Sequence, residues 1–206
     1  MPDVHDPLEE TASQTAGPYV HIGLVPDAAG LEAGHDALGG DIAGPRAEGE
    51  RIRVEGRVFD GTHAPVTDAV IEVWQANAAG RYAHPQGGGS VEEGFLGWGR
   101  ISSDFDTGTW GFDTIKPGVV QGLNGQMQAP HLNFWLVARG INIGLCTRMY
   151  FSDEDSANAA DPVLNLINTT HRRETLIAPR RECDGKAVYR FNIWLQGENE
   201  TVFFVP

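Results

Sequence analysis

The sequence predicts an all-β fold, a β-sandwich of mostly antiparallel strands with minor helix and an extended N-terminal arm. Glycine and proline are abundant, at 26 and 12 of 206 residues, or roughly 18% against about 12% on average, which indicates many turns. Short stretches of alternating apolar and polar residues recur between turn residues, a pattern typical of a sandwich or barrel. Hydrophobic residues make up 41% of the chain, enough for one well-cored domain.

The first quarter of the chain differs in composition from the rest. The stretch "AAGLEAGHDALGGDIAGPRAEGE" is rich in Gly, Ala and acidic residues and has no sustained period. We therefore expect residues 1–50 to form an N-terminal arm and loop-rich segment. Residues 51–206 are expected to form the β-sandwich core, so that the whole chain makes one domain.

Alternation and turn residues place the strands in order. "RIRVEGRVF" alternates and ends at the turn pair Asp60-Gly61, and a second strand is expected over residues 70–76. Further strands are expected in "TWGFDTI", "HLNFWLVARG", "GLCTRMYF", "KAVYRFNIWLQG" and "ETVFFV". One helix is expected in "DEDSANAA", with Ser152 starting a Ser-x-x-Asp capping pattern and Asp161-Pro162 ending it. A second short helical turn is expected in "VLNLI".

The charge balance excludes several classes of partner. The formal net charge is −13, and an acidic surface repels both phosphate backbones and anionic membrane surfaces. No run approaches the roughly 18 apolar residues that a membrane span needs. The start "MPDVHDPLEE" lacks a basic-then-apolar signal. We expect a cytoplasmic protein that binds neither nucleic acid nor membrane.

The stretch "APHLNFWLVARG" raises the question of a metal site. Residues two apart on a strand share a face, so a His-x-His pair would offer two ligands. Here His131 is followed by Asn133 instead of a second histidine. Phosphate-binding glycine loops, Gly-x-Ser-x-Gly elbows and Cys-x-x-Cys pairs are all missing from the sequence. The residues alone leave open whether a ligand was lost or the strand never held metal.

A family resemblance bears on this question. The order "VIEVWQANAAGRYAHP … TIKPGVV … APHLNFW … CTRMYF … DPVLNLI … RRETLIA" resembles the intradiol ring-cleaving dioxygenases over nearly the whole chain. "SQTAGPYVHIGL", "ARGINI" and "RRETLIA" are similar to the α chain of those members that have two homologous chains.

The resemblance implies where the cofactor lies. In the family, the catalytic β chain holds non-haem Fe(III) with two tyrosines and two histidines. The matching positions here are Tyr82, Val120, His131 and Asn133, so half of the ligand set is gone. Catalytic sites usually keep three or more protein ligands, and a ferric ion needs anionic donors in a protein interior. We expect this chain to hold no metal and no catalytic residue, and the partner β chain to bind the Fe(III).

The resemblance also implies a partner and a substrate. It predicts an αβ hetero-oligomer with a homologous β subunit, acting on protocatechuate and O₂. The α chain's arm and one arginine would line the partner's pocket; carried over, these are Thr15, Gly17, Pro18, Tyr19 and Arg139. A guanidinium can bind the substrate carboxylate bidentately. Gly17 allows a close backbone approach and Pro18 restricts the path of the arm.

Alternative interpretations remain at this stage. The chain is either this α subunit, a self-sufficient iron dioxygenase with an altered ligand set, or a transthyretin-like binding module without enzymatic role, which "EGRVFDGTHAPVTDAVIEVW" alone would fit. The stretch "HRRETLIAPRR" gathers Arg172, Arg173, Arg180 and Arg181. It is either a solvated loop with local ion pairs or a subunit interface, where arginine is enriched; its Leu176 and Ile177 favour the interface.

Overall fold

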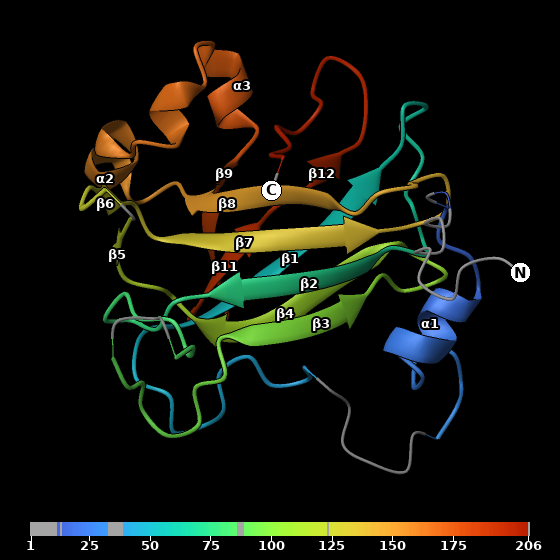
Figure 1. The fold of residues 1–206 in the computed structure, drawn as a ribbon, viewed down its shortest axis with the longest axis horizontal. Helices are drawn as coiled ribbons and strands as arrows, with labels where there is room; N and C mark the ends of the chain where they lie inside the picture. The colour runs from blue at the N-terminus through green and yellow to red at the C-terminus, as the bar shows by residue number, and fades with distance from the viewer. Residues whose placement is uncertain (1–11, 13, 33–38, 86–88, 123, 206) are drawn as a thin grey trace, which may run out of the picture.

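Two five-stranded sheets pack face to face (Figure 1). The structure, a computed structural model, describes residues 12, 14–32, 39–85, 89–122 and 124–205. One sheet has the order β10-β11-β1-β12, with β4 also paired to β1, and the other has the order β3-β2-β7-β8-β9. A two-stranded ladder, β5-β6, lies at one end. The predicted β-sandwich is therefore confirmed, and six of its nine strand pairs are antiparallel.

The elements have the following bounds. The strands are β1 (Arg51–Phe59), β2 (Val70–Gln75), β3 (Trp98–Ser102), β4 (Thr109–Ile115), β5 (Val120–Gln121), β6 (Met127–Gln128), β7 (His131–Val137), β8 (Leu145–Phe151), β9 (Ile177–Ala178), β10 (Arg180–Cys183), β11 (Lys186–Arg190) and β12 (Ile193–Trp194). The helices are α1 (Tyr19–Leu24), α2 (Asp155–Ala160), the 3₁₀ turn η1 (Leu164–Leu166) and α3 (Thr170–Glu174). Among the described residues, no helix has the length and apolar character needed to cross a membrane.

The alternation in β7 shows how the sequence builds the core. Leu132, Phe134 and Leu136 are buried between the sheets, while His131 and Asn133 point to the opposite face of the strand. In the neighbouring strands, too, alternate residues face the core. The outward face of the β3-β2-β7-β8 sheet therefore carries the polar side chains that matter for a site.

Three local expectations were wrong. Ser152 does not cap α2, because its hydroxyl accepts a hydrogen bond from the Arg180 N–H at 2.9 Å, and the N-cap residue is Glu154. "ETVFFV" forms a single bridge, between Phe204 and Cys146, and no strand. In this stretch the Thr201 N–H donates to the Trp194 carbonyl at 2.9 Å, and the Val202 N–H donates to the Thr175 hydroxyl at 3.2 Å. Within the arm, α1 was not expected.

Candidate functional site

The turn after β2 presents Tyr82. Asn77 is buried at this turn, and its Oδ1 accepts hydrogen bonds from the backbone N–H groups of Ala79 and Arg81 at 3.1 and 2.9 Å. Its Nδ2 donates to Glu92 at 2.6 Å. An asparagine that bonds its own following backbone stabilises a tight turn. The turn is therefore held in a fixed shape just before Tyr82.

The loop that carries Val120 packs against this turn. Gly80 has φ +75°, and a Cβ added there would lie 1.8 Å from the Val119 carbonyl oxygen. The backbone N–H of Gly118 donates to the Asn77 carbonyl at 2.9 Å. Only glycine combines a left-handed conformation with so close an approach. Val120 is then buried at the start of β5.

A directional chain of hydrogen bonds joins three of the four positions that match the family's iron ligands. Asn133 Nδ2 donates to the Trp74 carbonyl at 3.3 Å and to the Tyr82 hydroxyl at 3.2 Å. The Tyr82 hydroxyl lies 3.3 Å from His131 Nε2, and His131 Nδ1 lies 2.8 Å from the Ala129 carbonyl. Because a carbonyl only accepts, Nδ1 carries the imidazole proton and Nε2 accepts the tyrosine's proton. A proton thus bridges phenol and imidazole.

The electrostatics of this chain favour neutral groups. Burial, reinforced by the nearby Arg148 guanidinium, lowers the pKa of His131 to about 4. Burial also raises the pKa of Tyr82, although Asn133 and Arg148 act against it. Arg148 Nη1 donates to Gln128 Oε1 at 2.7 Å, and within the described residues no carboxylate lies at ion-pair distance from Arg148. A fixed positive charge therefore lies beside these positions.

A buried carboxylate fixes the backbone that leads into β7. Asp161 is fully buried, and its Oδ2 accepts from the Ala129 N–H at 2.8 Å. Its Oδ1 accepts from the N–H groups of Val163 and Leu164, both at 2.8 Å, and from the Tyr150 hydroxyl at 3.2 Å. Four donors on one carboxylate compensate its burial. This network ties the start of β7 to the region after α2.

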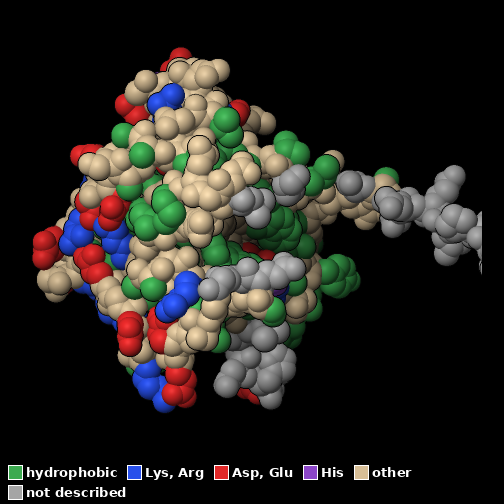
Figure 2. Space-filling model, turned by 60° about the vertical axis from the view of Figure 1, so that its left-hand side comes forward, with side chains coloured by type: hydrophobic (Ala, Val, Ile, Leu, Met, Phe, Trp, Pro, Cys, Tyr) green, Lys and Arg blue, Asp and Glu red, His purple; other side chains and the backbone are tan. Residues whose placement is uncertain are grey.

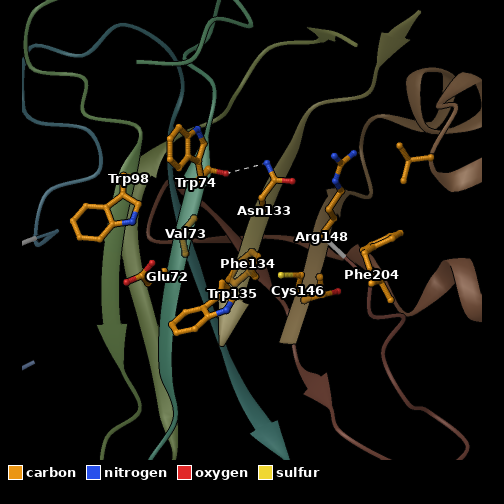
Figure 3. Close-up of a pocket in the computed structure, with 13 residues that line it drawn as sticks. Glu72, Val73, Trp74, Trp98, Asn133, Phe134, Trp135, Cys146, Arg148 and Phe204 are labelled. Carbon is orange, nitrogen blue, oxygen red and sulfur yellow. Dashed lines mark hydrogen bonds between the residues drawn. The ribbon is translucent and has the colours of Figure 1, made fainter. Parts of the chain in front are cut away.

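A hollow of about 390 Å³ opens on the outward face of the same sheet (Figure 3). In Figure 3 the side chains of Trp74, Asn133 and Arg148 lie at one end of it, and Trp135 and Cys146 lie at the other. Figure 2, which brings the β5-β6 end of the molecule forward, shows hydrophobic side chains near the middle of the view and charged ones gathered along its left edge. Most of the residues that line the hollow are aromatic or apolar, and Glu72 and Arg148 are its charged members.

The donor set at these positions does not fit a ferric ion. Val120 offers no donor, and the Asn133 amide nitrogen donates protons instead of accepting a metal. Tyr82 and His131 use their remaining capacity on each other. In the described part of the chain, no three His, Cys, Asp or Glu side chains come together as a metal site requires. The positive charge of the nearby Arg148 guanidinium makes these positions still less suitable for a trivalent cation.

The substrate-binding residues expected in the arm and at Arg139 form a second group. The Thr15 hydroxyl accepts a hydrogen bond from the Gly140 N–H at 2.7 Å, so the arm lies beside the turn that carries Arg139. Arg139 Nε donates to Asp68 Oδ2 at 2.5 Å. Tyr19 is 83% exposed at the start of α1. The structure thus brings the two predicted segments together.

The two groups lie at opposite ends of β7. His131 begins the strand and Arg139 follows its end, which separates them by roughly 26 Å at about 3.3 Å per residue. In Figure 1, β7 runs from the side of β5 and β6 toward the side of α1 and the N-terminus. Arg139 and the arm therefore cannot line a pocket around His131 of the same chain.

Two interpretations were open for Arg172, Arg173, Arg180 and Arg181: a solvated loop with local ion pairs, or a subunit interface. Arg172 bonds to the Glu200 carbonyl and carboxylate, Arg180 Nη1 donates to Asp153 at 3.1 Å, and Arg173 donates to a backbone carbonyl. The fourth arginine of the stretch is exposed. Three of the four thus have partners within the chain, and for two of them, Arg172 and Arg180, a partner is a carboxylate; the subunit interface stays a prediction.

The sequence reading missed Asp68 and Arg148. Asp68 lies just before β2 and Arg148 lies in β8. The neighbours of both come from distant parts of the chain, so their roles depend on strand pairing. For Arg148 a weak signal existed, since alternation in "GLCTRMYF" places it on the same face as Tyr150. Asp68 had no signal beyond its place in a turn before a strand.

The β-sandwich fold is one that dioxygenases use, and comparison with known proteins identifies the family. A family described as "Dioxygenase" matches residues 32–197. The chain belongs to this dioxygenase family.

Three relatives show which members of the family this chain is similar to. A Pseudomonas putida protein named protocatechuate 3,4-dioxygenase alpha chain is 53% identical over 197 residues, covering 96% of both chains. The protocatechuate 3,4-dioxygenase beta chain of Burkholderia cepacia is 36% identical over 176 residues, or 81% of this chain and 73% of that one. The crystal structure of catechol 1,2-dioxygenase from Pseudomonas arvilla C-1 shares the fold, with a TM-score of 0.56 at 22% identity, over 76% of this chain and 55% of that one.

Proposed function

We propose that this chain is the non-iron α subunit of a protocatechuate 3,4-dioxygenase. It pairs with a homologous β chain and shapes the pocket in which that chain opens protocatechuate with O₂, giving 3-carboxy-cis,cis-muconate. The observation that supports this most is the closed hydrogen-bond chain from Asn133 through Tyr82 to His131. Relatives named alpha and beta chains, both similar to this chain over most of its length, supply the pairing.

The Fe(III) of the assembled enzyme belongs, in this proposal, to the β chain. The iron supplies the activation of catechol and O₂ for ring opening. This chain supplies none of the ligands, because Tyr82 and His131 are engaged with each other and Val120 has no donor. Its own contribution is to bind and orient the part of the substrate that does not react.

The arm and Arg139 are suited to that contribution. Arg139 is 74% exposed, and Tyr19 projects from the start of α1. Pro18 precedes the helix with φ −56°, within the proline range. A Cβ added to Gly17 would meet no atom of the described residues within 4 Å, so no contact seen there requires glycine. Together with Thr15, these residues are free to face a partner.

The separation of the two groups supports a paired arrangement. Homologous chains commonly associate about a two-fold or pseudo-two-fold axis. If the outward sheet faces pack with their strands antiparallel, the Arg139 end of one chain lies against the ligand end of the other. The α chain would then complete the β chain's pocket from outside.

Replacing Arg139 by Ala in the assembled αβ enzyme tests this role. A charge-assisted hydrogen bond to a carboxylate contributes about 1.5–3 kcal/mol. We expect KM for protocatechuate to rise roughly 10- to 100-fold, and KM for catechol, which has no carboxylate, to change little. Steady-state kinetics with both substrates measure the difference.

Arg46→Ala is the matched control, since Arg46 is also an exposed arginine in a surface ion pair, with Glu93 at 2.6 Å. It should leave both KM values unchanged. Equal losses on protocatechuate and catechol in Arg139→Ala would reject the carboxylate role.

A further inference from the structure

The contact between Asp68 and Arg139 has an unusual asymmetry of exposure. Arg139 Nε lies 2.5 Å from Asp68 Oδ2, and the aspartate side chain is only 16% exposed while the arginine is 74% exposed. An ion pair between two exposed side chains stabilises little, because both must be ordered. Here one partner is already held by the fold.

Strand pairing holds Asp68 in place. β2 and β7 pair in antiparallel register, with Val70 opposite Val137 at one end. Continuing this register by two residues places Asp68 opposite Arg139. Opposite charges directly across an antiparallel pair attract each other. The ion pair is therefore a direct consequence of the sheet, and its geometry follows that of the two strand ends.

The arm helix covers the same end of the sheet. Arg100 Nη1 donates to the Leu24 carbonyl at 3.2 Å, and the ring of the buried His21 packs on Phe105 with centroids 5.0 Å apart. Burial lowers the pKa of His21, and the carboxylate of Asp68 acts against it. α1 thus lies close enough to shield Asp68 from water, which strengthens its attraction for a cation.

The way in which Asp68 binds Arg139 leaves one side of the guanidinium available. Only Nε is engaged; within the described residues, Nη1 and Nη2 of Arg139 have no hydrogen-bond partner. A guanidinium presents its donors in a fixed planar fork, and the two terminal nitrogens together can bind a carboxylate bidentately. Fixing Nε therefore orients the free end without occupying it.

We propose that Asp68 is a positioning residue for Arg139, which it presents to the carboxylate of the substrate in the partner's pocket. This inference rests on the proposed function. A free arginine side chain must be ordered when a ligand binds, and ordering before binding removes that cost. Asp68 thereby increases the preference for catechols that carry a carboxylate over those that do not.

The test uses Asp68→Ala and Asp68→Asn in the assembled αβ enzyme, with protocatechuate and catechol as substrates. Asp68→Ala should raise KM for protocatechuate about three- to tenfold, with kcat for both substrates and KM for catechol unchanged. Asp68→Asn keeps an oxygen for Nε but loses the charge, so its KM should lie between those of Asp68→Ala and the unmodified enzyme. Should the alanine variant not assemble, the asparagine variant alone still tests the claim.

Glu93→Ala is the control, because Glu93 binds Arg46 in an ion pair elsewhere on the surface, and it should change neither KM. Asp68→Ala added to Arg139→Ala should cause no further loss. An unchanged or lower KM for protocatechuate in both Asp68 variants, or additive losses in the double variant, would overturn the inference. If Arg139→Ala itself leaves protocatechuate unaffected, the proposed function of Arg139 fails instead.

Discussion

The most informative residues are Tyr82, His131 and Asn133, which form a hydrogen-bonded chain at positions where the family resemblance led us to look for metal ligands. Between the Tyr82 hydroxyl and His131 Nε2 a single proton is shared across 3.3 Å. Each group is neutral in this arrangement, and the shifts of both pKa values favour the neutral forms. Tyr82 and His131 thus satisfy each other's hydrogen-bonding groups, and Asn133 donates to the same hydroxyl.

His131 should make stability depend on pH. Its pKa is about 4 in the folded chain, against the 6.5 of an ordinary exposed histidine, so the unfolded state binds more protons between these pH values. The contribution of His131 to the free energy of unfolding is therefore complete above about pH 6.5. It decreases as the pH drops toward 4, by about 3 kcal/mol in all. Urea unfolding at several pH values, compared between the unmodified chain and His131→Gln, measures this slope.

His171→Gln is a suitable control, since His171 is exposed and its ring nitrogen contacts the Glu198 carbonyl at 3.1 Å. It should keep the pH dependence, whereas His131→Gln should flatten it. If both variants show the slope of the unmodified chain, the buried neutral state of His131 is not its cause.

At the scale of elements, Asp161 connects the region after α2 with the start of β7. Asp161→Asn would place an amide N–H₂ group against one or more of the N–H donors that now bind the carboxylate. We expect a loss of about 2–3 kcal/mol in the free energy of unfolding. Denaturant titration measures it, and Asp155→Asn on the exposed side of α2 should stay within about 0.5 kcal/mol. Equal effects in the two variants would contradict the role.

Strands with clear alternation could be predicted from the sequence, as could the helical segments in "DEDSANAA" and "VLNLI", whereas α1 and α3 could not. "HLNFWLV" alternates because one face is buried, so β7 was evident. α1 has only six residues, too few to show a helical period, and it is stabilised by packing on the sheet. "ETVFFV" has the composition of a strand, but the Val202 N–H donates to the Thr175 hydroxyl instead of to a neighbouring strand.

The site was predictable in the same partial way. Alternation places His131 and Asn133 on one face, and the structure agrees. The bond from Tyr82 to His131 joins residues 49 apart in sequence, and the Asp68–Arg139 pair joins residues 71 apart. Such pairs depend on strand register and on turns held by Asn77 and Gly80, which no local pattern specifies.

At the scale of the whole molecule, one sheet carries two ends with different properties. The end near β5 and β6 holds the closed hydrogen-bond chain, and the end near α1 holds the exposed Arg139 (Figure 1). A chain that kept a complete iron site would use the end near β5 and β6. A chain that completes a partner's pocket would use the end near α1. The contacts of the described residues favour the second description.

Iron content tests this account most directly. The chain should be coexpressed with an iron-bearing β chain, purified as the complex, and measured for iron per αβ pair by elemental analysis. The account predicts one iron per pair, none in this chain when it is purified alone, and no ring cleavage by it alone. Two irons per pair, or stoichiometric iron with ring cleavage by the isolated chain, would contradict it.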